Sequence, residues 1–184
     1  MRKLPQILNA EIIAQTRLFK VEALHLKFDN GEERHYERLK AGERGAVMVI
    51  PITADGQCLL IKEYAAGLEH YELGLPKGLI EKDESVLDAA NREMMEEVGF
   101  GAERLQLLKT ISLAPGYLNH KMHVVIARNL YEKRLPGDEP EPLEVVPWSL
   151  DDLDSLFKRD DCTEARSIAA LYLVRDFLRS ETKE

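Results

Sequence analysis

The sequence predicts an α+β fold in which helices flank a mixed β-sheet. The chain has 184 residues, of which 45% are hydrophobic and 32% are charged. This balance is typical of a globular protein that buries its own core, and it argues against intrinsic disorder, collagen and a coiled coil. Strand-like runs come first, followed by a helix, further strands and two helices, so the order of elements does not favour regular βαβ units.

Two hairpin signals predict the strands of the first third of the chain. The turn sequences Asp29-Asn30-Gly31 and Asp55-Gly56 each stand between two strand-like runs, an arrangement typical of β-hairpins. We therefore expect strand, turn and strand twice, over residues 18–28 with 34–39 and over residues 46–52 with 57–64. Further strands are expected at 105–113, 122–130 and 144–148, and helices at 85–98, 150–157 and 163–179.

The charge of the chain is negative and unevenly distributed. Its 33 acids against 25 bases give −8, which argues against nucleic acid as the main ligand because phosphate-binding proteins usually carry a basic face. Residues 78–100 hold seven acids and two bases, and residues 132–161 hold ten acids and four bases. The second stretch includes residues 136–147, where four of the eight prolines predict a loop.

Cysteine content and hydropathy indicate the compartment. Cys58 and Cys162 are far apart and lack metal-ligand spacing, so neither a disulfide framework nor a zinc site is expected. The N-terminus has no apolar stretch long enough for a signal peptide. The longest strongly apolar run, residues 46–52, is far shorter than the ~20 residues that span a bilayer. We expect a cytoplasmic protein without a membrane partner.

The predicted helix at 85–98 carries an unfavourable set of charges. Ser85 and Asp88 fit a capping box, and Gly99 fits a left-handed cap at the other end. Glu93, Glu96 and Glu97 then share one face, because positions three and four apart are neighbours, and they lie where the helix dipole disfavours negative charge. A solvated acidic face is one interpretation. The other is a site for Mg²⁺ or Mn²⁺, which prefer carboxylate oxygens.

The surrounding segment favours the metal site. Residues 78–100 read GLIEKDESVLDAANREMMEEVGF and resemble the Nudix box, Gly-x5-Glu-x7-Arg-Glu-U-x-Glu-Glu-x-Gly-U, in which U is bulky and apolar. The resemblance covers nine defined positions: Gly78, Glu84, Arg92, Glu93, Met94, Glu96, Glu97, Gly99 and Phe100. It implies a Nudix hydrolase, with an α/β/α sandwich around a mixed sheet, that uses Mg²⁺ or Mn²⁺ to hydrolyse a nucleoside diphosphate linked to another group.

The same resemblance implies roles for the residues of the box. Glu93 and Glu97 correspond to the main metal ligands, and Glu96 is implied to share in binding the metal or to act as a bridging ligand. Arg92 and Glu84 are implied to support the site, with Arg92 orienting the glutamates by ion pairing. The two glycines have structural roles, Gly78 in a tight loop and Gly99 at the end of the helix.

Segments outside the box point to the substrate. Pro115 and Tyr117 lie in the sequence SLAPGY, and Pro115 stands 15 residues after Phe100, which is similar to ADP-ribose pyrophosphatases. The sequence LPKG at 75–78 is similar to diadenosine polyphosphate hydrolases. Over nearly the whole chain the similarity is greatest to bacterial ADP-compound hydrolases. This implies hydrolysis of ADP-ribose, NADH and diadenosine polyphosphates to AMP and the other phosphorylated half.

The sequence leaves the catalytic base open. One candidate is Glu93 itself, and the others are Glu139 and Glu141 in the proline-rich loop, provided that the loop folds over the metal site. A third interpretation is that the acids of the loop only solvate the surface.

The chain is expected to divide into residues 1–44 and residues 45–184. The resemblance implies that the first part, a β-strand extension, helps to form a homodimer and an adenine pocket, and that the second is the catalytic domain.

Two other functions are weighed against ADP-compound hydrolysis. One is a pyrophosphatase that sanitises the nucleotide pool by hydrolysing nucleoside triphosphates, which the N-terminal extension and Pro115 disfavour. The other is a non-catalytic sensing module, which would be expected to lose box carboxylates.

Overall fold

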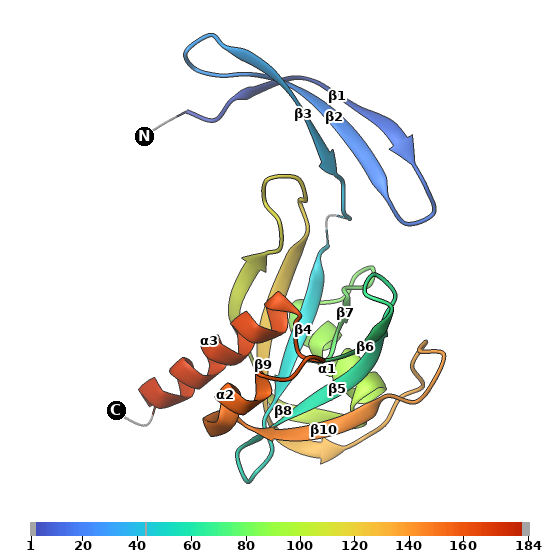
Figure 1. The fold of residues 1–184 in the computed structure, drawn as a ribbon, viewed down its shortest axis with the longest axis vertical. Coiled ribbons are helices and arrows are strands. Elements are labelled where there is room, and N and C mark those ends of the chain that lie inside the picture. Colours follow the sequence, from blue (N-terminus) through green and yellow to red (C-terminus); the bar gives the residue numbers. More distant parts are fainter. Residues whose placement is uncertain (1–2, 43, 182–184) are drawn as a thin grey trace. The chain divides into compact units, whose positions relative to one another are not determined.

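The computed structural model describes residues 3–42 and 44–181, which divide into two compact units (Figure 1). The first unit contains the N-terminal strands and residues 112–121, and the second contains residues 46–111 and the chain from Met122 onward. Residues 112–121 thus cluster with the N-terminal strands, although the predicted division placed them in the catalytic domain.

The first unit is a three-stranded antiparallel sheet. Its order is β1-β2-β3, and the strands are β1 (Gln6–Gln15), β2 (Lys20–Lys27) and β3 (Glu33–Leu39). Gly31 in the turn between β2 and β3 has φ +87°, so this predicted hairpin is confirmed. The N–H of Leu39 donates to the carbonyl of Tyr117 at 2.7 Å, and the N–H of Ala41 donates to the side chain of Asn119 at 2.6 Å. These bonds attach residues 112–121 to the end of β3.

The second unit contains two sheets, and one of them is mixed. In the four-stranded sheet, of order β7-β4-β9-β8, β4 runs parallel to β9 and antiparallel to β7. The other sheet, β10-β5-β6, is antiparallel. The strands are β4 (Ala46–Pro51), β5 (Gln57–Ala65), β6 (His70–Gly74), β7 (Lys77–Leu79), β8 (Phe100–Ser112), β9 (Lys121–Glu132) and β10 (Glu144–Ser149).

Helices cover both faces of the central strands. All six residues of β4 are buried, and their side chains alternate between two cores because neighbouring strand residues point to opposite faces. Val47 and Val49 pack with Met94 of α1 (Val86–Glu97), whereas Met48 and Ile50 pack with Leu171 of α3 (Ala165–Glu181). A 3₁₀ turn at Leu150–Asp152 and α2 (Leu153–Leu156) lie on the α3 side. The predicted α/β/α sandwich is confirmed (Figure 1).

Some predicted boundaries were wrong. The loop predicted at 136–147 ends at residue 143, because β10 begins at Glu144. Pro147 fits in β10 because this strand lies at the edge of its sheet, beside β5 alone. The strand predicted from residue 105 begins at Phe100. The turn and short helix at 150–156 replace the single helix predicted there.

Strands β1, β6 and β7 were not predicted from the sequence, and β7 has only three residues. Within residues 3–42 and 44–181, no helix combines the length and the apolar character needed to cross a membrane.

Candidate active site

The acidic helix α1 begins and ends at the predicted residues. The hydroxyl of Ser85 accepts a hydrogen bond from the N–H of Asp88 at 3.1 Å and donates to its carboxylate at 2.6 Å. Gly99 follows the helix with φ +85°, a conformation that side-chain-bearing residues rarely adopt. Both caps are therefore confirmed. They hold α1 in register, so that its glutamates point to one side.

A distant arginine supplies the positive charge that the end of α1 lacks. The last turn of α1, which is fully described, contains no basic residue. Arg134 donates to the carbonyls of Glu96 and Val98 at 3.3 and 3.2 Å. A Cβ on Gly99 would lie 2.7 Å from the Arg134 guanidinium, so glycine is also needed to admit this cap. Cationic donors satisfy free carbonyls and counter the negative end of the helix dipole.

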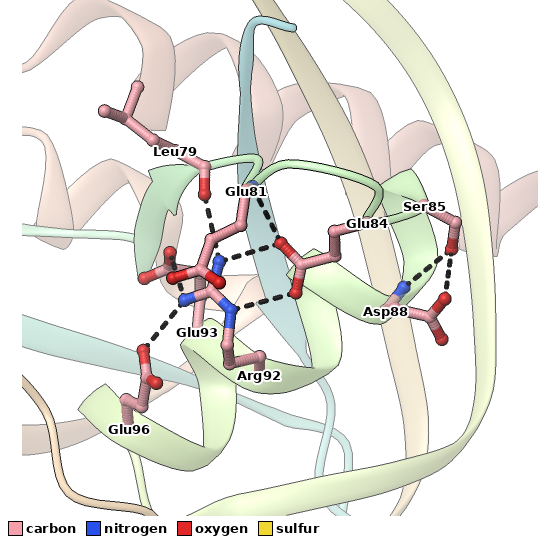
Figure 2. A network of polar contacts seen from close by, with 8 residues as sticks. All are labelled: Leu79, Glu81, Glu84, Ser85, Asp88, Arg92, Glu93 and Glu96. Atoms are coloured by element: carbon pink, nitrogen blue, oxygen red, sulfur yellow. Dashed lines mark hydrogen bonds and ion pairs between the residues drawn. The ribbon is translucent and has the colours of Figure 1, made fainter.

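Arg92 is the centre of a polar network that joins the box together (Figure 2). Its guanidinium donates to Glu84 at 2.9 and 3.0 Å, to Glu93 at 2.8 Å and to Glu96 at 2.9 Å. It also donates to the carbonyl of Leu79 at 2.9 Å. The hydrogen bond from Arg92 lowers the pKa of Glu84. The expected ion pairs of Arg92 are present, and its role in catalysis stays a prediction.

Glu93 and Glu97 are buried on the inner side of this network. Their exposed fractions are 8% and 6%. Glu97 accepts a hydrogen bond from the N–H of Lys77 at 2.9 Å, but burial raises the pKa of its carboxyl to about 8, and the charge of Glu93 raises it further. Burial also raises the pKa of Glu93, although Arg92 donates to it. Two carboxyls that resist ionisation therefore lie one helical turn apart.

Gly78 makes room for one of these carboxylates. A Cβ at this position would lie 2.1 Å from the carboxylate of Glu93, far inside van der Waals contact. β7 brings Gly78 there by pairing antiparallel with β4, in which Gly78 lies opposite Val47. The glycine is thus required by the close approach of a functional side chain.

The carboxylate cluster fits a divalent cation in its chemistry. Glu93, Glu96 and Glu97 present hard oxygen donors, and the raised pKa values of Glu93 and Glu97 indicate a local shortage of positive charge. Among residues 3–42 and 44–181, no three His, Cys, Asp or Glu side chains form a closed coordination group. In this structure Glu93 and Glu96 bind Arg92, while Glu97 binds the backbone of Lys77.

The proline-rich loop lies against the same cluster. Residues 134–143 and the three glutamates line a hollow of about 430 Å³. Glu139 is partly buried, and burial raises the pKa of its carboxyl, with Glu63 and Asp138 adding to the effect. Glu141 is exposed and accepts a hydrogen bond from the hydroxyl of Tyr71. The structure therefore brings both loop candidates near the box and gives them different surroundings.

The predicted substrate contacts lie in the first unit. Pro115 and Tyr117 line a hollow of about 200 Å³ together with Tyr36 and Arg38. Tyr117 is 60% exposed. Whether this hollow binds substrate stays a prediction.

Three polar contacts near the site were not predicted from the sequence. They are the Arg134 cap of α1, the hydrogen bond between Tyr71 and Glu141, and an ion pair between Lys77 and Glu63 at 2.5 Å. Each joins residues at least 14 positions apart, and no local pattern marks such partners.

Known proteins resemble this chain in sequence and in fold. The NUDIX domain model matches residues 42–171, and the model of the NudE-type Nudix hydrolase N-terminal domain matches residues 5–38. The ADP compounds hydrolase NudE of Escherichia coli is 51% identical over 96% of this chain and 95% of its own. The ADP-ribose pyrophosphatase of Bacillus subtilis is 28% identical over 89% of this chain and 91% of its own. A crystal structure of an ADP compounds hydrolase, 50% identical, superposes with a TM-score of 0.91 and covers 98% of this chain and 97% of its own.

Replacing Glu97 by Gln is expected to stabilise the metal-free protein at alkaline pH. The pKa of this carboxyl is about 8 in the folded chain and near 4.5 without its surroundings. Between these values the folded state binds more protons than the unfolded state, so the free energy of unfolding falls as pH rises. Gln does not titrate. The gain in melting temperature of Glu97→Gln over the wild type, measured with a chelator, should therefore grow from about pH 5 to about pH 8.5.

Glu96→Gln is the matched control, because Glu96 belongs to the same helix but its side chain is 21% exposed, whereas Glu97 is buried. An equal gain in both variants, or a loss of stability in Glu97→Gln at alkaline pH, would contradict the electrostatic description of Glu97.

Proposed function

Because this chain belongs to the Nudix hydrolases, we propose that it cleaves the pyrophosphate linkage of ADP-containing compounds and releases AMP and the other phosphorylated half. The observation that carries this proposal is the complete box, in which Arg92 holds three glutamates beside a partly buried loop acid. The choice of ADP compounds is supported by the relative from Escherichia coli, which is similar over nearly its whole length. The proposed substrates are ADP-ribose, NADH and diadenosine polyphosphates.

Nudix hydrolases generally depend on divalent metal ions. We propose that Glu93, Glu96 and Glu97 hold Mg²⁺ or Mn²⁺, since their carboxylates have suitable oxygen donors and two of them are buried. Such a cation, when bound, supplies charge neutralisation at the phosphate oxygens and lowers the pKa of water. Arg92 is then a positioning residue, because it fixes Glu93 and Glu96 through its guanidinium.

Glu139 is proposed as the general base that takes a proton from the attacking water. Its carboxyl is partly buried in the hollow shared with the box, and its raised pKa brings it closer to the value that suits proton transfer near neutral pH. Glu141 is proposed to position the loop instead, because Tyr71 already binds its carboxylate. Glu93 is the remaining alternative, and its bond to Arg92 makes it less available as an acceptor.

The first unit is proposed to carry the dimer contact and the adenine pocket. All ten residues of β1 are exposed, and a second copy of the chain could cover its apolar side chains. These are Ile7, Leu8, Ile12 and Ile13. The hollow beside Pro115 and Tyr117 offers aromatic and apolar surface for adenine.

We place the reaction in the cytoplasm, where buried free thiols such as Cys58 and Cys162 stay reduced.

A substrate panel tests the proposed function. With Mg²⁺ or Mn²⁺ the protein is expected to release AMP from ADP-ribose, NADH and a diadenosine polyphosphate, as measured by chromatographic separation of the products. Nucleoside triphosphates are expected to react poorly. Release of pyrophosphate from triphosphates, without AMP from any ADP compound, would reject the proposal in favour of triphosphate removal.

Separate replacement of the two loop acids identifies the base. Glu139→Gln is expected to lower kcat by about 100-fold or more, in line with the loss of a general base. Glu141→Gln should lower it by less than about tenfold, because a Gln oxygen can still accept the hydrogen bond from Tyr71. The measurement is kcat for ADP-ribose at saturating metal. If neither variant loses about tenfold, the role returns to Glu93.

Gly78→Ala is expected to lower the activity while leaving the stability nearly unchanged. The new Cβ must displace the carboxylate of Glu93, so kcat should fall by about 100-fold or more if Glu93 holds the metal. The melting temperature should change little, because only the end of a flexible side chain has to move. Gly42→Ala is the control, since a Cβ there meets nothing within 4 Å. A Gly78→Ala variant with wild-type kcat would show that the position of Glu93 does not matter.

A further inference from the structure

A second pocket in the catalytic unit is not used by the chemistry described above. It has a volume of about 520 Å³ and lies between the β5–β6 hairpin and the start of α3. Lys77 connects it with the box, because its side chain lines the pocket while its N–H donates to Glu97 at 2.9 Å. Lys77 therefore contacts both this pocket and the carboxylate cluster.

The pocket presents two pairs of opposite charges. Glu63 binds Lys77 at 2.5 Å, and Glu164 binds Arg166. All four side chains remain between 21% and 31% exposed. Glu164 already accepts four hydrogen bonds, from Arg166 and Ser167, so Glu63, Lys77 and Arg166 are the side chains that can form further ones. Glu63 offers an acceptor next to the donor Lys77, and Arg166 offers further donors, which matches sugar hydroxyls because every hydroxyl both donates and accepts. A phosphate would meet the carboxylates of Glu63, Glu72 and Glu164 and is disfavoured.

One aromatic residue, Tyr64, lines this pocket, and it is 50% exposed. Tyr71, on the neighbouring strand, is 44% exposed and meets Tyr64 edge-on, with 5.5 Å between ring centroids. An exposed ring held in place by a second ring is a surface on which a nucleobase can stack.

We propose that this pocket binds the second nucleoside of dinucleotide substrates, with its ribose at Glu63, Lys77 and Arg166 and its base on the ring of Tyr64. The inference rests on the proposed function and adds a preference: among ADP compounds, those whose second half carries a base gain affinity from Tyr64. ADP-ribose, which lacks that base, shares only the contacts of the sugar.

Replacement of Tyr64 tests the contact with the base. The ratio of kcat/KM for NADH to kcat/KM for ADP-ribose is expected to fall at least about fivefold in Tyr64→Ala, mainly through the KM for NADH, as loss of one stacked base predicts. Tyr64→Phe keeps the ring and should stay within about twofold of the wild-type ratio. A smaller fall in the alanine variant, or an equal fall in both variants, overturns the proposal.

Direct binding provides a readout without catalysis. NADH fluorescence, titrated with metal-free protein in a chelator, should show weaker binding by Tyr64→Ala than by Tyr64→Phe. Equal binding by the two variants counts against the stacking contact.

Arg166→Ala tests the contact with the sugar and should raise KM for both NADH and ADP-ribose about fivefold or more, as loss of a charged hydrogen bond predicts. Arg175→Ala is its control, because Arg175 is also on α3, also pairs with an acid, and does not line this pocket. Equal KM values in the two arginine variants overturn the sugar contact.

A wild type that hydrolyses ADP-ribose but not NADH overturns this inference and leaves the proposed function standing. A wild type that hydrolyses neither refutes the proposed function itself.

Discussion

The guanidinium of Arg92 holds together a group of carboxylates that would otherwise repel one another. It donates to Glu84, Glu93 and Glu96, and it reaches the carbonyl of Leu79 in β7. The network thereby ties α1 to the loop before it and to the edge of the mixed sheet. Like charges at neighbouring helical positions destabilise a helix, and such a partner offsets the repulsion. The arrangement of the whole site depends on this one side chain.

The sheet and the two caps of α1 determine where this network lies. β4 is buried on both faces, so α1 and α3 can pack against opposite sides of it. β7 pairs with β4 over three residues and brings Gly78 against Glu93. At the other end of α1, Arg134 binds the last carbonyls and joins the end of β9 to the helix. The loop that carries Glu139 therefore starts beside the carboxylates that it is proposed to serve.

The sequence predicted those features that depend on neighbours along the chain. Ser85 and Gly99 mark the ends of α1 because cap chemistry is local, and the hairpin at Gly31 follows from turn chemistry. The sequence did not predict β7, since three residues become a strand only by pairing with β4. Arg134 and Tyr71 were missed for the same reason, because their partners come from distant segments. On a helical projection Arg92 lies beyond Glu96, yet its long side chain also reaches Glu93.

The burial of Glu93 and Glu97 has a consequence for affinity. Folding of α1 and β7 already removes these carboxylates from water and places them one turn apart. A cation that neutralises them does not have to desolvate these two carboxylates, so its binding free energy is not reduced by that cost. The burial that destabilises the metal-free protein thus favours the binding of a cation, so stability without metal is lost where affinity for metal is gained.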